Sequence, residues 1–280
     1  MGKAGGRDWL QIYSIYGTDE WQTVGFLAFN AFLFAFLSLL LFVYFAPILS
    51  SAQSFLPALP LPLLRFAAGF SGSVLSLSAL CLLFAASNVL YSSLPLRWLM
   101  AQRMIAAVPN WFAVRTALDV GCGRGILLNA VALQLKKEGS CGRVVGLDRD
   151  RGTAVAALRR ASVEGVQEYV TCREGSAHCL PFPDGYFDVV LSAVYLKRQG
   201  DSAAERWRAI GEIIRVLKPG GIGVLWDLSC VPEFAKRLTE MRMEEVRVSG
   251  RVTAYMVGSH IVSFRKPTAV SADDWRANIC

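Results

Sequence analysis

The pattern of apolar and polar positions separates an almost uncharged first third of the chain from a mixed remainder. Residues 21–64 contain no charged side chain, and there is none between Arg65 and Arg97. Two apolar runs fill this region, Val24–Leu49 and Phe66–Tyr91. Each run is longer than the ~20 residues with which a helix crosses a hydrocarbon layer ~30 Å thick. The pattern therefore predicts two hydrophobic transmembrane helices.

The segment between the two runs contains Pro57, Pro60 and Pro62, and its one charged residue is Arg65. Prolines interrupt helices because they lack the N–H group and crowd the preceding turn. An apolar connection of this kind fits a chain that crosses the bilayer twice, and it also fits a hairpin that bends back in the interface. Residues 24–91 are thus expected to form a membrane anchor of either topology.

Basic residues flank the apolar region on both sides. Lys3 and Arg7 precede it and Arg97 and Arg103 follow it, whereas the connection is almost free of them. Because short basic segments stay on the cytosolic side of membrane proteins, we expect residues 1–23 and the chain beyond the anchor in the cytosol. We therefore expect an integral protein of the endoplasmic reticulum membrane.

Residues 92–111 are expected to connect the anchor to a following domain. Apolar side chains are interspersed there with Arg97 and Arg103, a pattern typical of an amphipathic helix. Such a helix can lie among lipid headgroups. A first helix packed onto the domain fits the same pattern equally well.

Beyond residue 112, short apolar strands alternate with helical segments. We predict strands at 117–120, 142–148, 168–174, 186–194, 221–228, 244–249 and 259–266, and helices after Gly125 and at 153–164, 203–217 and 231–240. Strands that alternate with helices indicate a parallel sheet with helices on both faces, and the last two strands indicate an antiparallel hairpin. The fold class expected for residues 112–267 is α/β, and residues 268–280 are a C-terminal tail.

Charge and cysteine content exclude some functions. The net charge is +7, and the whole excess of basic residues follows the anchor. These charges fall on predicted helix surfaces, where they are usually solvated, so we expect no nucleic acid partner; near an anionic leaflet they favour the membrane surface. The odd number of cysteines, seven, argues against a disulfide framework, and the lack of a CxxC pair argues against a zinc site.

The stretch TALDVGCGRGILLNAVA, Thr116–Ala132, places three glycines between an apolar strand and a helix. Such a turn lets a ligand approach the backbone and the free N–H groups at the helix start. Gly121, Gly123 and Gly125 are spaced G-x-G-x-G, which differs from the dinucleotide pattern G-x-G-x-x-G. Asp119, two residues earlier, disfavours a pyrophosphate and suits a cationic ligand.

This strand and turn resemble motif I of the class I S-adenosylmethionine-dependent methyltransferases. Three further features are similar to this family in the same order: Asp148 at the end of the second strand, EGSAHCLPFPDGYFDVVLS up to the fourth strand, and VLKPGGIGVLWD before and in the fifth. The resemblance covers residues 112–267. It implies a Rossmann-like, seven-stranded methyltransferase sheet, S-adenosyl-L-methionine as the cofactor, and methylation as the reaction.

The resemblance also implies roles for individual residues. Asp119 would hold the methionine amino group, and the glycine turn would line the methionine and ribose. Asp148 would bind the ribose hydroxyls, and Arg149 would pack near the adenine. Ser176 stands where the family usually has Asp, and its neutral contact with the adenine amino group is weaker than a charge-assisted one. The residues expected at the cofactor are Asp119, Gly121, Cys122, Gly123, Gly125, Asp148, Arg149, Ser176, Ala177 and Ser192.

Methyl transfer from a sulfonium requires an acceptor aligned with the methyl group in a dry site more than it requires acid–base groups. Tyr195, just beyond the fourth strand, is the candidate catalytic residue, and neither His178 nor His260 is expected to act as a base. An anchored enzyme would meet acceptors dissolved in the lipid bilayer, so we expect a small lipophilic acceptor. A catalytically silent cofactor-binding scaffold and a protein methyltransferase are the alternatives.

Overall fold

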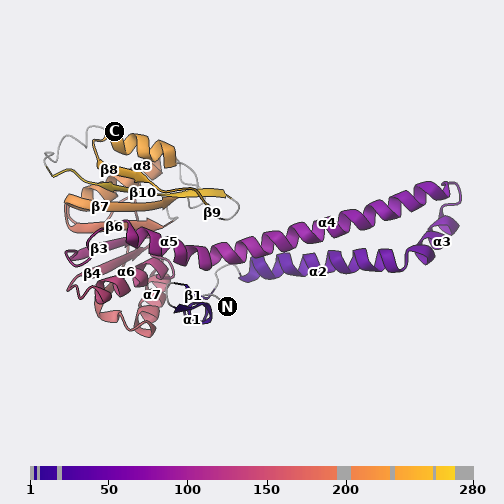
Figure 1. Ribbon diagram of the computed structural model, residues 1–280, viewed down its shortest axis with the longest axis horizontal. Coiled ribbons are helices and arrows are strands. Elements are labelled where there is room, and N and C mark those ends of the chain that lie inside the picture. Colours follow the sequence, from indigo (N-terminus) through magenta and orange to yellow (C-terminus); the bar gives the residue numbers. More distant parts are fainter. Residues whose placement is uncertain are drawn as a thin grey trace. The chain divides into compact units, whose positions relative to one another are not determined.

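The computed structural model describes residues 3–4, 7–17, 21–193, 203–227, 231–254 and 257–268. The chain forms two compact units. One is helical and comprises Thr18–Ser93, and the other joins Met1–Gly17 to Leu94–Cys280 around a sheet (Figure 1).

The helical unit consists of α2 (Trp21–Val43), α3 (Phe45–Phe55) and α4 (Leu61–Ser93). The single helix expected over 24–49 is wrong, because α2 ends at Val43 and α3 follows after one residue. Pro47 explains the interruption, since it has no N–H to donate to the Val43 carbonyl and its ring crowds that group. The helix expected over 66–91 lies within α4. Pro62 falls in the first turn of α4, where an N–H is not needed.

Small side chains line the contact between α2 and α4. The Ser38 hydroxyl donates to the Gly72 carbonyl at 2.9 Å and lies 2.7 Å from the Ser76 hydroxyl. A Cβ at Gly72 would come within 2.8 Å of the Phe42 ring. Large apolar side chains are instead exposed, at 60% or more for Phe26, Phe29, Phe32, Phe66 and Phe70. Small residues inside and large apolar residues outside are typical of helices that pack in lipid.

Two helical segments among the described residues are long and apolar enough to cross a membrane, Trp21–Val43 and Leu61–Ala106. The second segment comprises α4 and α5 (Pro95–Ala106), which are separated at Leu94. Leu94 has φ −134° and ψ −56°, outside the helical range, and Pro95 begins the new helix. The break therefore coincides with the boundary between the two units.

In its described residues, the second unit is built around a mixed sheet of eight strands. They are β3 (Thr116–Val120), β4 (Arg143–Asp148), β5 (Val170–Glu174), β6 (Phe187–Ala193), β7 (Leu217–Asp227), β8 (Glu244–Val248), β9 (Val252–Ala254) and β10 (Val257–Arg265). Their order is β5-β4-β3-β6-β7-β10-β8, with β9 paired to β10, and β3 to β7 run parallel.

The α/β class and the antiparallel hairpin of β8 and β10 are confirmed, whereas the expected number of seven strands is wrong. The additional strand is β9. Residues 257–259 of the long strand β10 pair with β9, and β8 pairs only with positions 262–265. One long strand therefore supports two short antiparallel partners in succession.

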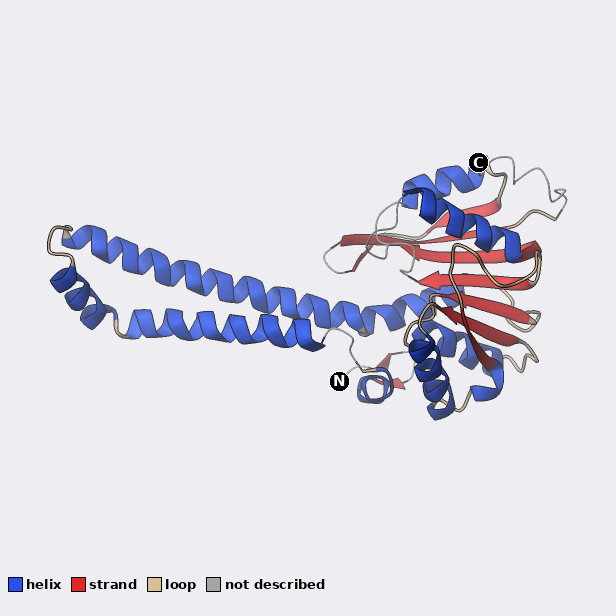
Figure 2. Ribbon diagram, turned by 180° about the vertical axis from the view of Figure 1, so that it is seen from behind, coloured by secondary structure: helices blue, strands red, loops and turns tan. Residues whose placement is uncertain are grey.

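Helices cover both faces of the sheet (Figure 2). Besides α5 they are α6 (Ile126–Lys137), α7 (Arg151–Val163), α8 (Ala203–Val216) and α9 (Val231–Glu240), and a short 3-10 helix spans Gln167–Tyr169. Successive side chains of β6 point to opposite faces of the sheet, so they pack into two different hydrophobic cores. Val189 and Leu191 join the core with α5, α6 and α7, and Val190 joins the core with α8 and α9. The strand order changes direction between β3 and β6, and ligands of open α/β sheets bind outside the carboxyl ends of the strands at such a point.

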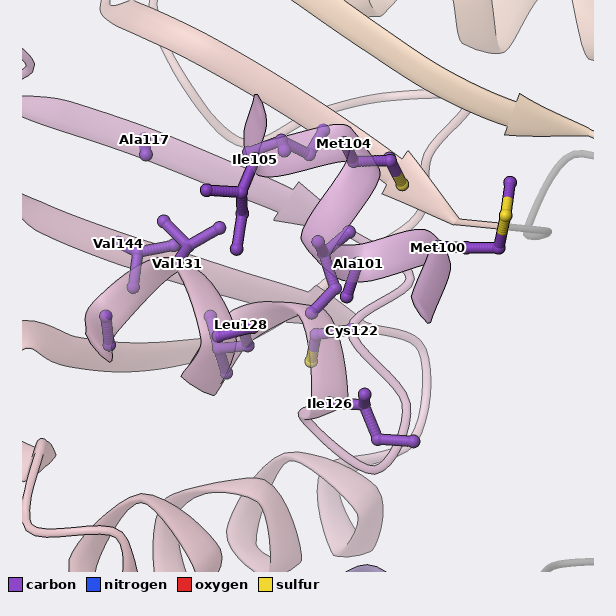
Figure 3. Close-up of a cluster of buried hydrophobic side chains, with 14 of the residues drawn as sticks. Met100, Ala101, Met104, Ile105, Ala117, Cys122, Ile126, Leu128, Val131 and Val144 are labelled. Carbon is purple, nitrogen blue, oxygen red and sulfur yellow. The ribbon is translucent and has the colours of Figure 1, made fainter. Parts of the chain in front are cut away.

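The helix α5 occupies the connector expected over 92–111. Its buried side chains are Leu96, Trp98, Met100, Ala101, Met104 and Ile105. Figure 3 shows several of them in one cluster with side chains of α6 and β3. The apolar face of α5 is thus part of the core of the sheet unit, which confirms the packed-helix interpretation of the connector.

The N-terminal segment also belongs to the sheet unit. In it, β1 (Lys3–Ala4) pairs with β2 (Arg7–Asp8), and α1 (Trp9–Tyr16) follows. Ile12 and Tyr16 are each 1% exposed and join the core cluster that contains Trp98. The sequence pattern does not predict this packing, because a helix of eight residues has too few positions for a clear apolar period.

Candidate active site

The glycine turn joins β3 to α6 and is bound to the end of β4. The N–H groups of Gly121 and Cys122 both donate to the Leu147 carbonyl, at 2.8 and 3.0 Å. Gly121, Gly123 and Gly125 have φ of 75°, 50° and 80°, a left-handed conformation that residues with a Cβ disfavour. A Cβ at Gly123 would meet no atom closer than 3.9 Å. The backbone is therefore open to close approach at this point.

Asp119 lies near the carboxyl end of β3, on the sheet face of α5 and α6. The residue is 1% exposed, and neither carboxylate oxygen has a hydrogen-bond partner among the described residues. The pKa of Asp119 is raised to about 8, mainly because of burial; the nearby Leu128 backbone N–H lowers it in part, and the negative charge of Asp148 adds to the increase. A buried carboxylate without a partner is costly. It indicates a ligand that supplies a cation or hydrogen-bond donors.

Asp148 ends β4 beside the turn and is 5% exposed. Its Oδ2 accepts a hydrogen bond from the Gly123 N–H at 3.0 Å, and its Oδ1 accepts one from the Asp150 N–H at 3.1 Å. A carboxylate has about four acceptor positions. Asp148 can therefore accept two further hydrogen bonds, as a vicinal diol would donate.

Arg149 and Ser176 come together through His178. Nη2 of Arg149 lies 2.9 Å from Nδ1 of His178, and Oγ of Ser176 lies 3.3 Å from the same nitrogen. Because a guanidinium only donates, Nδ1 is the acceptor and the ring proton is assigned to Nε2. Ala177, which stands between Ser176 and His178 in the sequence, is 1% exposed and packs in the core. His178, for which no role was expected, thus bridges two residues expected at the adenine.

Two other candidate residues use their side chains within the protein. The Ser192 hydroxyl donates to the Val120 carbonyl at 3.1 Å and joins the ends of β6 and β3. The Cys122 side chain is buried, and a hydrogen bond with Cys172 together with burial raises the pKa of its thiol. A thiol whose pKa is raised is a poor nucleophile. The Cys122 side chain therefore packs inside the protein, beside Gly146 of β4.

The candidate catalytic residue Tyr195 lies outside the described residues. Nδ1 of His260 lies 3.0 Å from the Ser249 carbonyl and donates to it, which agrees with a structural role. Among the described residues, no group of three or more His, Cys, Asp or Glu side chains could hold a metal ion.

Sequence reasoning missed two residues that border the turn, Arg124 and Asn129. Nη1 of Arg124 donates to the Tyr16 carbonyl at 2.5 Å, and Nδ2 of Asn129 donates to the Tyr16 hydroxyl at 3.2 Å. The one signal in the sequence was an asparagine inside the apolar stretch ILLNAVALQL. Its partner is 113 residues away in the chain, so the pattern could not identify the contact.

Residues 118–225 match the family model of a methyltransferase domain. The matched segment begins inside β3 and ends inside β7. It therefore contains the glycine turn, Asp148 and Ser176, but not the N-terminal segment or the helical unit.

Two curated relatives are similar to part of the chain. The demethylmenaquinone methyltransferase of Symbiobacterium thermophilum is 36% identical over 104 residues, which are 37% of this chain and 39% of that protein. The chloroplastic 2-phytyl-1,4-beta-naphthoquinone methyltransferase of Arabidopsis thaliana is 38% identical over 105 residues, which are 37% of this chain and 38% of that protein. The chain thus spans about two fifths of the length of these relatives.

Among solved structures, the [4+2]-cyclase SpnF is similar with a TM-score of 0.52 over 64% of this chain and 84% of that chain, at 20% sequence identity. Likeness at this identity identifies the Rossmann-like α/β fold and does not identify the reaction. The family match, the glycine turn and the two buried aspartates lie in the same segment. Residues 118–225 are therefore similar to a methyltransferase domain, a family whose cofactor is S-adenosylmethionine.

Proposed function

We propose that this chain is an S-adenosylmethionine-dependent methyltransferase that acts on a small lipophilic acceptor of the quinone type at a membrane. The observation that carries the proposal is the buried carboxylate of Asp119 beside the glycine turn, for which the described residues supply no hydrogen-bond partner. A carboxylate at this place fits the amino group of S-adenosylmethionine and repels a pyrophosphate. When bound, the cofactor would supply a methyl group on a sulfonium, and its transfer to the acceptor by in-line displacement would leave S-adenosylhomocysteine.

The other residues of the site fit the same cofactor. The carboxylate of Asp148, fixed by the Gly123 N–H, has acceptor positions left for the ribose hydroxyls. Arg149 and Ser176, joined through His178, border the adenine. We assign cofactor binding to Asp119, Gly121, Cys122, Gly123, Gly125, Asp148, Arg149, Ser176, Ala177 and Ser192.

The relatives support the acceptor class. Both are named for quinones, one for demethylmenaquinone and one for a naphthoquinone with a phytyl chain. A ring with a long hydrocarbon chain partitions into lipid, because its apolar surface is removed from water there. We propose an acceptor of this kind, and Tyr195 is the candidate residue on the acceptor side.

The helical unit supports a membrane location. The helices α2 and α4 expose their large apolar side chains and contact each other through small residues. We propose that they anchor the enzyme in the bilayer and that both flanking segments face the cytosol, because basic residues flank the hairpin on both sides. The prediction of the endoplasmic reticulum is tested by cell fractionation.

A cofactor-binding scaffold without transferase activity is a second candidate function. The neutral Ser176 in place of the usual Asp favours it, since a charge-assisted contact with the cofactor is missing. The similarity to the [4+2]-cyclase SpnF also indicates that this fold is compatible with reactions other than methyl transfer. A protein methyltransferase is a third candidate.

The test compares the full chain in lipid nanodiscs with a variant in which a flexible Gly-Ser linker replaces Thr18–Ser93. The variant keeps residues 1–17, because they belong to the sheet unit. Calorimetric titration with S-adenosylmethionine should give the same affinity for both proteins. Transfer of a labelled methyl group to demethylmenaquinone in vesicles should be faster with the full chain, and transfer to a water-soluble short-chain quinone should be equal.

Each outcome separates the candidates. Folded full-length protein that does not bind the cofactor contradicts the proposed function. Binding without methylation of any quinone favours the scaffold, and methylation of a protein in a membrane extract favours the protein methyltransferase. Equal turnover of demethylmenaquinone in vesicles by both proteins contradicts the role of the hairpin and leaves the transferase activity in place.

A further inference from the structure

We infer that Tyr16, at the end of α1, is a positioning residue for the glycine turn, so that the cofactor site is complete only when the N-terminal segment is docked. The inference rests on the proposed cofactor site. It extends that site to a segment outside the matched methyltransferase domain of residues 118–225.

The Tyr16 hydroxyl joins two helices of the methyltransferase domain. The residue is 1% exposed, and its hydroxyl accepts a hydrogen bond from Nδ2 of Asn129 at 3.2 Å and donates one to Oε1 of Glu164 at 3.1 Å. Asn129 is fully buried in the first turns of α6, and its N–H donates to the Gly125 carbonyl at 2.9 Å. The hydroxyl thus contacts the helix that starts from the glycine turn, one helical turn beyond Gly125.

The carboxyl end of α1 is bound directly to the turn. The last carbonyls of a helix have no partner within it, and cationic side chains stabilise them. Arg124, between two glycines of the turn, donates from Nη1 to the Tyr16 carbonyl at 2.5 Å. Arg160 of α7 donates from Nε to the Ile15 carbonyl at 3.1 Å and from Nη1 to the Arg124 carbonyl at 3.3 Å. Arg124 is therefore held through both its side chain and its backbone.

We call these five residues, Ile15, Tyr16, Arg124, Asn129 and Arg160, the N-terminal clasp. Gly17 ends α1 with φ 61°, and its N–H donates to the Tyr13 carbonyl at 2.9 Å. A Cβ at Gly17 would lie 3.1 Å from Nη1 of Arg124. A glycine at this position therefore provides both the left-handed helix end and the space that Arg124 needs.

The N-terminal clasp holds the glycine turn, a segment that loses much conformational entropy when it is ordered. Glycine loses more conformational freedom than other residues when it is fixed, and the turn has three glycines in five residues. A turn that is already fixed before the ligand arrives loses less entropy on binding, and this raises affinity. Loss of the clasp should therefore weaken cofactor binding even though no clasp residue needs to contact the cofactor.

The test uses the full chain in nanodiscs and compares Tyr16→Phe with Tyr13→Phe. Both changes remove one phenolic hydroxyl from α1, and Tyr13 lies one helical turn earlier and outside the clasp. Calorimetry with S-adenosylmethionine should show affinity reduced about 3- to 10-fold for Tyr16→Phe and unchanged for Tyr13→Phe. Hydrogen exchange of the ligand-free protein should be faster at the amides of residues 121–129 only in Tyr16→Phe.

A second pair of variants tests the backbone contact. Arg124→Met should weaken the cofactor affinity as Tyr16→Phe does, and Arg124→Lys should restore part of it because a lysine still donates to helix carbonyls. The inference is overturned if Tyr16→Phe changes neither the cofactor affinity nor the hydrogen exchange of residues 121–129. A lower thermal stability of Tyr16→Phe does not rescue it when affinity and exchange are both unchanged. If the wild-type chain does not bind the cofactor, the proposed function fails, whereas the exchange experiment still decides whether the clasp orders the turn.

Discussion

The N–H of Gly123 donates a hydrogen bond of 3.0 Å to Oδ2 of Asp148, which lies 25 residues further along the chain. This bond joins the glycine turn after β3 to the end of β4. It fixes the carboxylate proposed to bind the ribose relative to the turn proposed to hold the methionine part of the cofactor. Two strand ends that are adjacent in the sheet are thereby joined directly at the proposed site.

Asp148→Asn should weaken the binding of S-adenosylmethionine about 10- to 100-fold. An asparagine has one acceptor oxygen, so its NH2 group must face the Gly123 N–H, the Asp150 N–H or the ribose. Calorimetric titration measures the effect. The matched control is Asp150→Ala, which removes the cap of α7, where Asp150 accepts from the N–H groups of Gly152 and Thr153 at 3.2 and 2.9 Å. The control should lower the free energy of unfolding by about 1 kcal/mol at unchanged affinity, and equal losses of affinity in both variants would contradict the role of Asp148.

Asp119 should make the ligand-free protein less stable as the pH rises. The folded pKa of Asp119 is raised to about 8, against about 3.9 for an unfolded chain. Between these values the folded state binds more protons, so the free energy of unfolding falls with increasing pH. Asp119→Asn should remove this slope and raise the free energy of unfolding at pH 8 by about 1–3 kcal/mol. Urea unfolding from pH 5 to 9 measures it, and parallel curves for wild type and variant would show that Asp119 does not titrate in this range.

The same carboxylate should release a proton when the cofactor binds near neutral pH. The cationic amino group favours the ionised form of Asp119, which is mostly protonated below its raised pKa of about 8 in the ligand-free protein. Calorimetric titrations at pH 6.5 in buffers with different ionisation enthalpies measure the number of protons released. We expect a value between zero and one for wild type and close to zero for Asp119→Asn, whose affinity should also be lower. Binding without proton release in the wild type would place the amino group elsewhere.

Ser176→Asp should strengthen the binding of S-adenosylmethionine about 3- to 10-fold. A carboxylate would provide the charge-assisted contact with the adenine amino group that the serine hydroxyl lacks. Ser176→Asn is the matched control, because it has a similar size and no charge, and its affinity should stay close to that of the wild type. An affinity that does not change in Ser176→Asp would mean that this side chain does not face the adenine.

Gly72→Leu should separate α2 from α4, because the added side chain would meet the Phe42 ring, which lies 2.8 Å from the position of a Cβ. The hydroxyl oxygens of Ser38 and Ser76 are 2.7 Å apart, so a Ser38→Cys/Ser76→Cys chain should form a disulfide on mild oxidation. Gly72→Leu should reduce the yield of this disulfide in nanodiscs. Gly69→Leu, at a position with no atom within 4 Å of the added Cβ, should not. The same yield in both variants would contradict the close packing at Gly72.

The local pattern was sufficient for much of this molecule. Apolar runs without charge identified the helical unit, and alternating strands and helices identified the α/β class, because periodicity reflects which faces are buried. The glycine spacing and Asp119 identified the turn, since a left-handed backbone and a charge next to it depend on residues that are close in sequence. Pro47 was also visible in the sequence, and its effect on the helix over 24–49 was overlooked.

Only the tertiary structure decided how distant segments meet. It placed α5 in the core of the sheet unit, added β9 to the sheet, and docked α1 so that Tyr16 contacts Arg124 and Asn129 across more than 100 residues of sequence. It also buried Asp119, with no hydrogen-bond partner among the residues that the structure describes, and this burial raises the pKa of a carboxylate that the sequence shows as an ordinary aspartate. Burial, hydrogen-bond partners and charge interactions depend on neighbours in space, so the sequence determined the elements and the turn, and the tertiary structure determined the chemistry of the site.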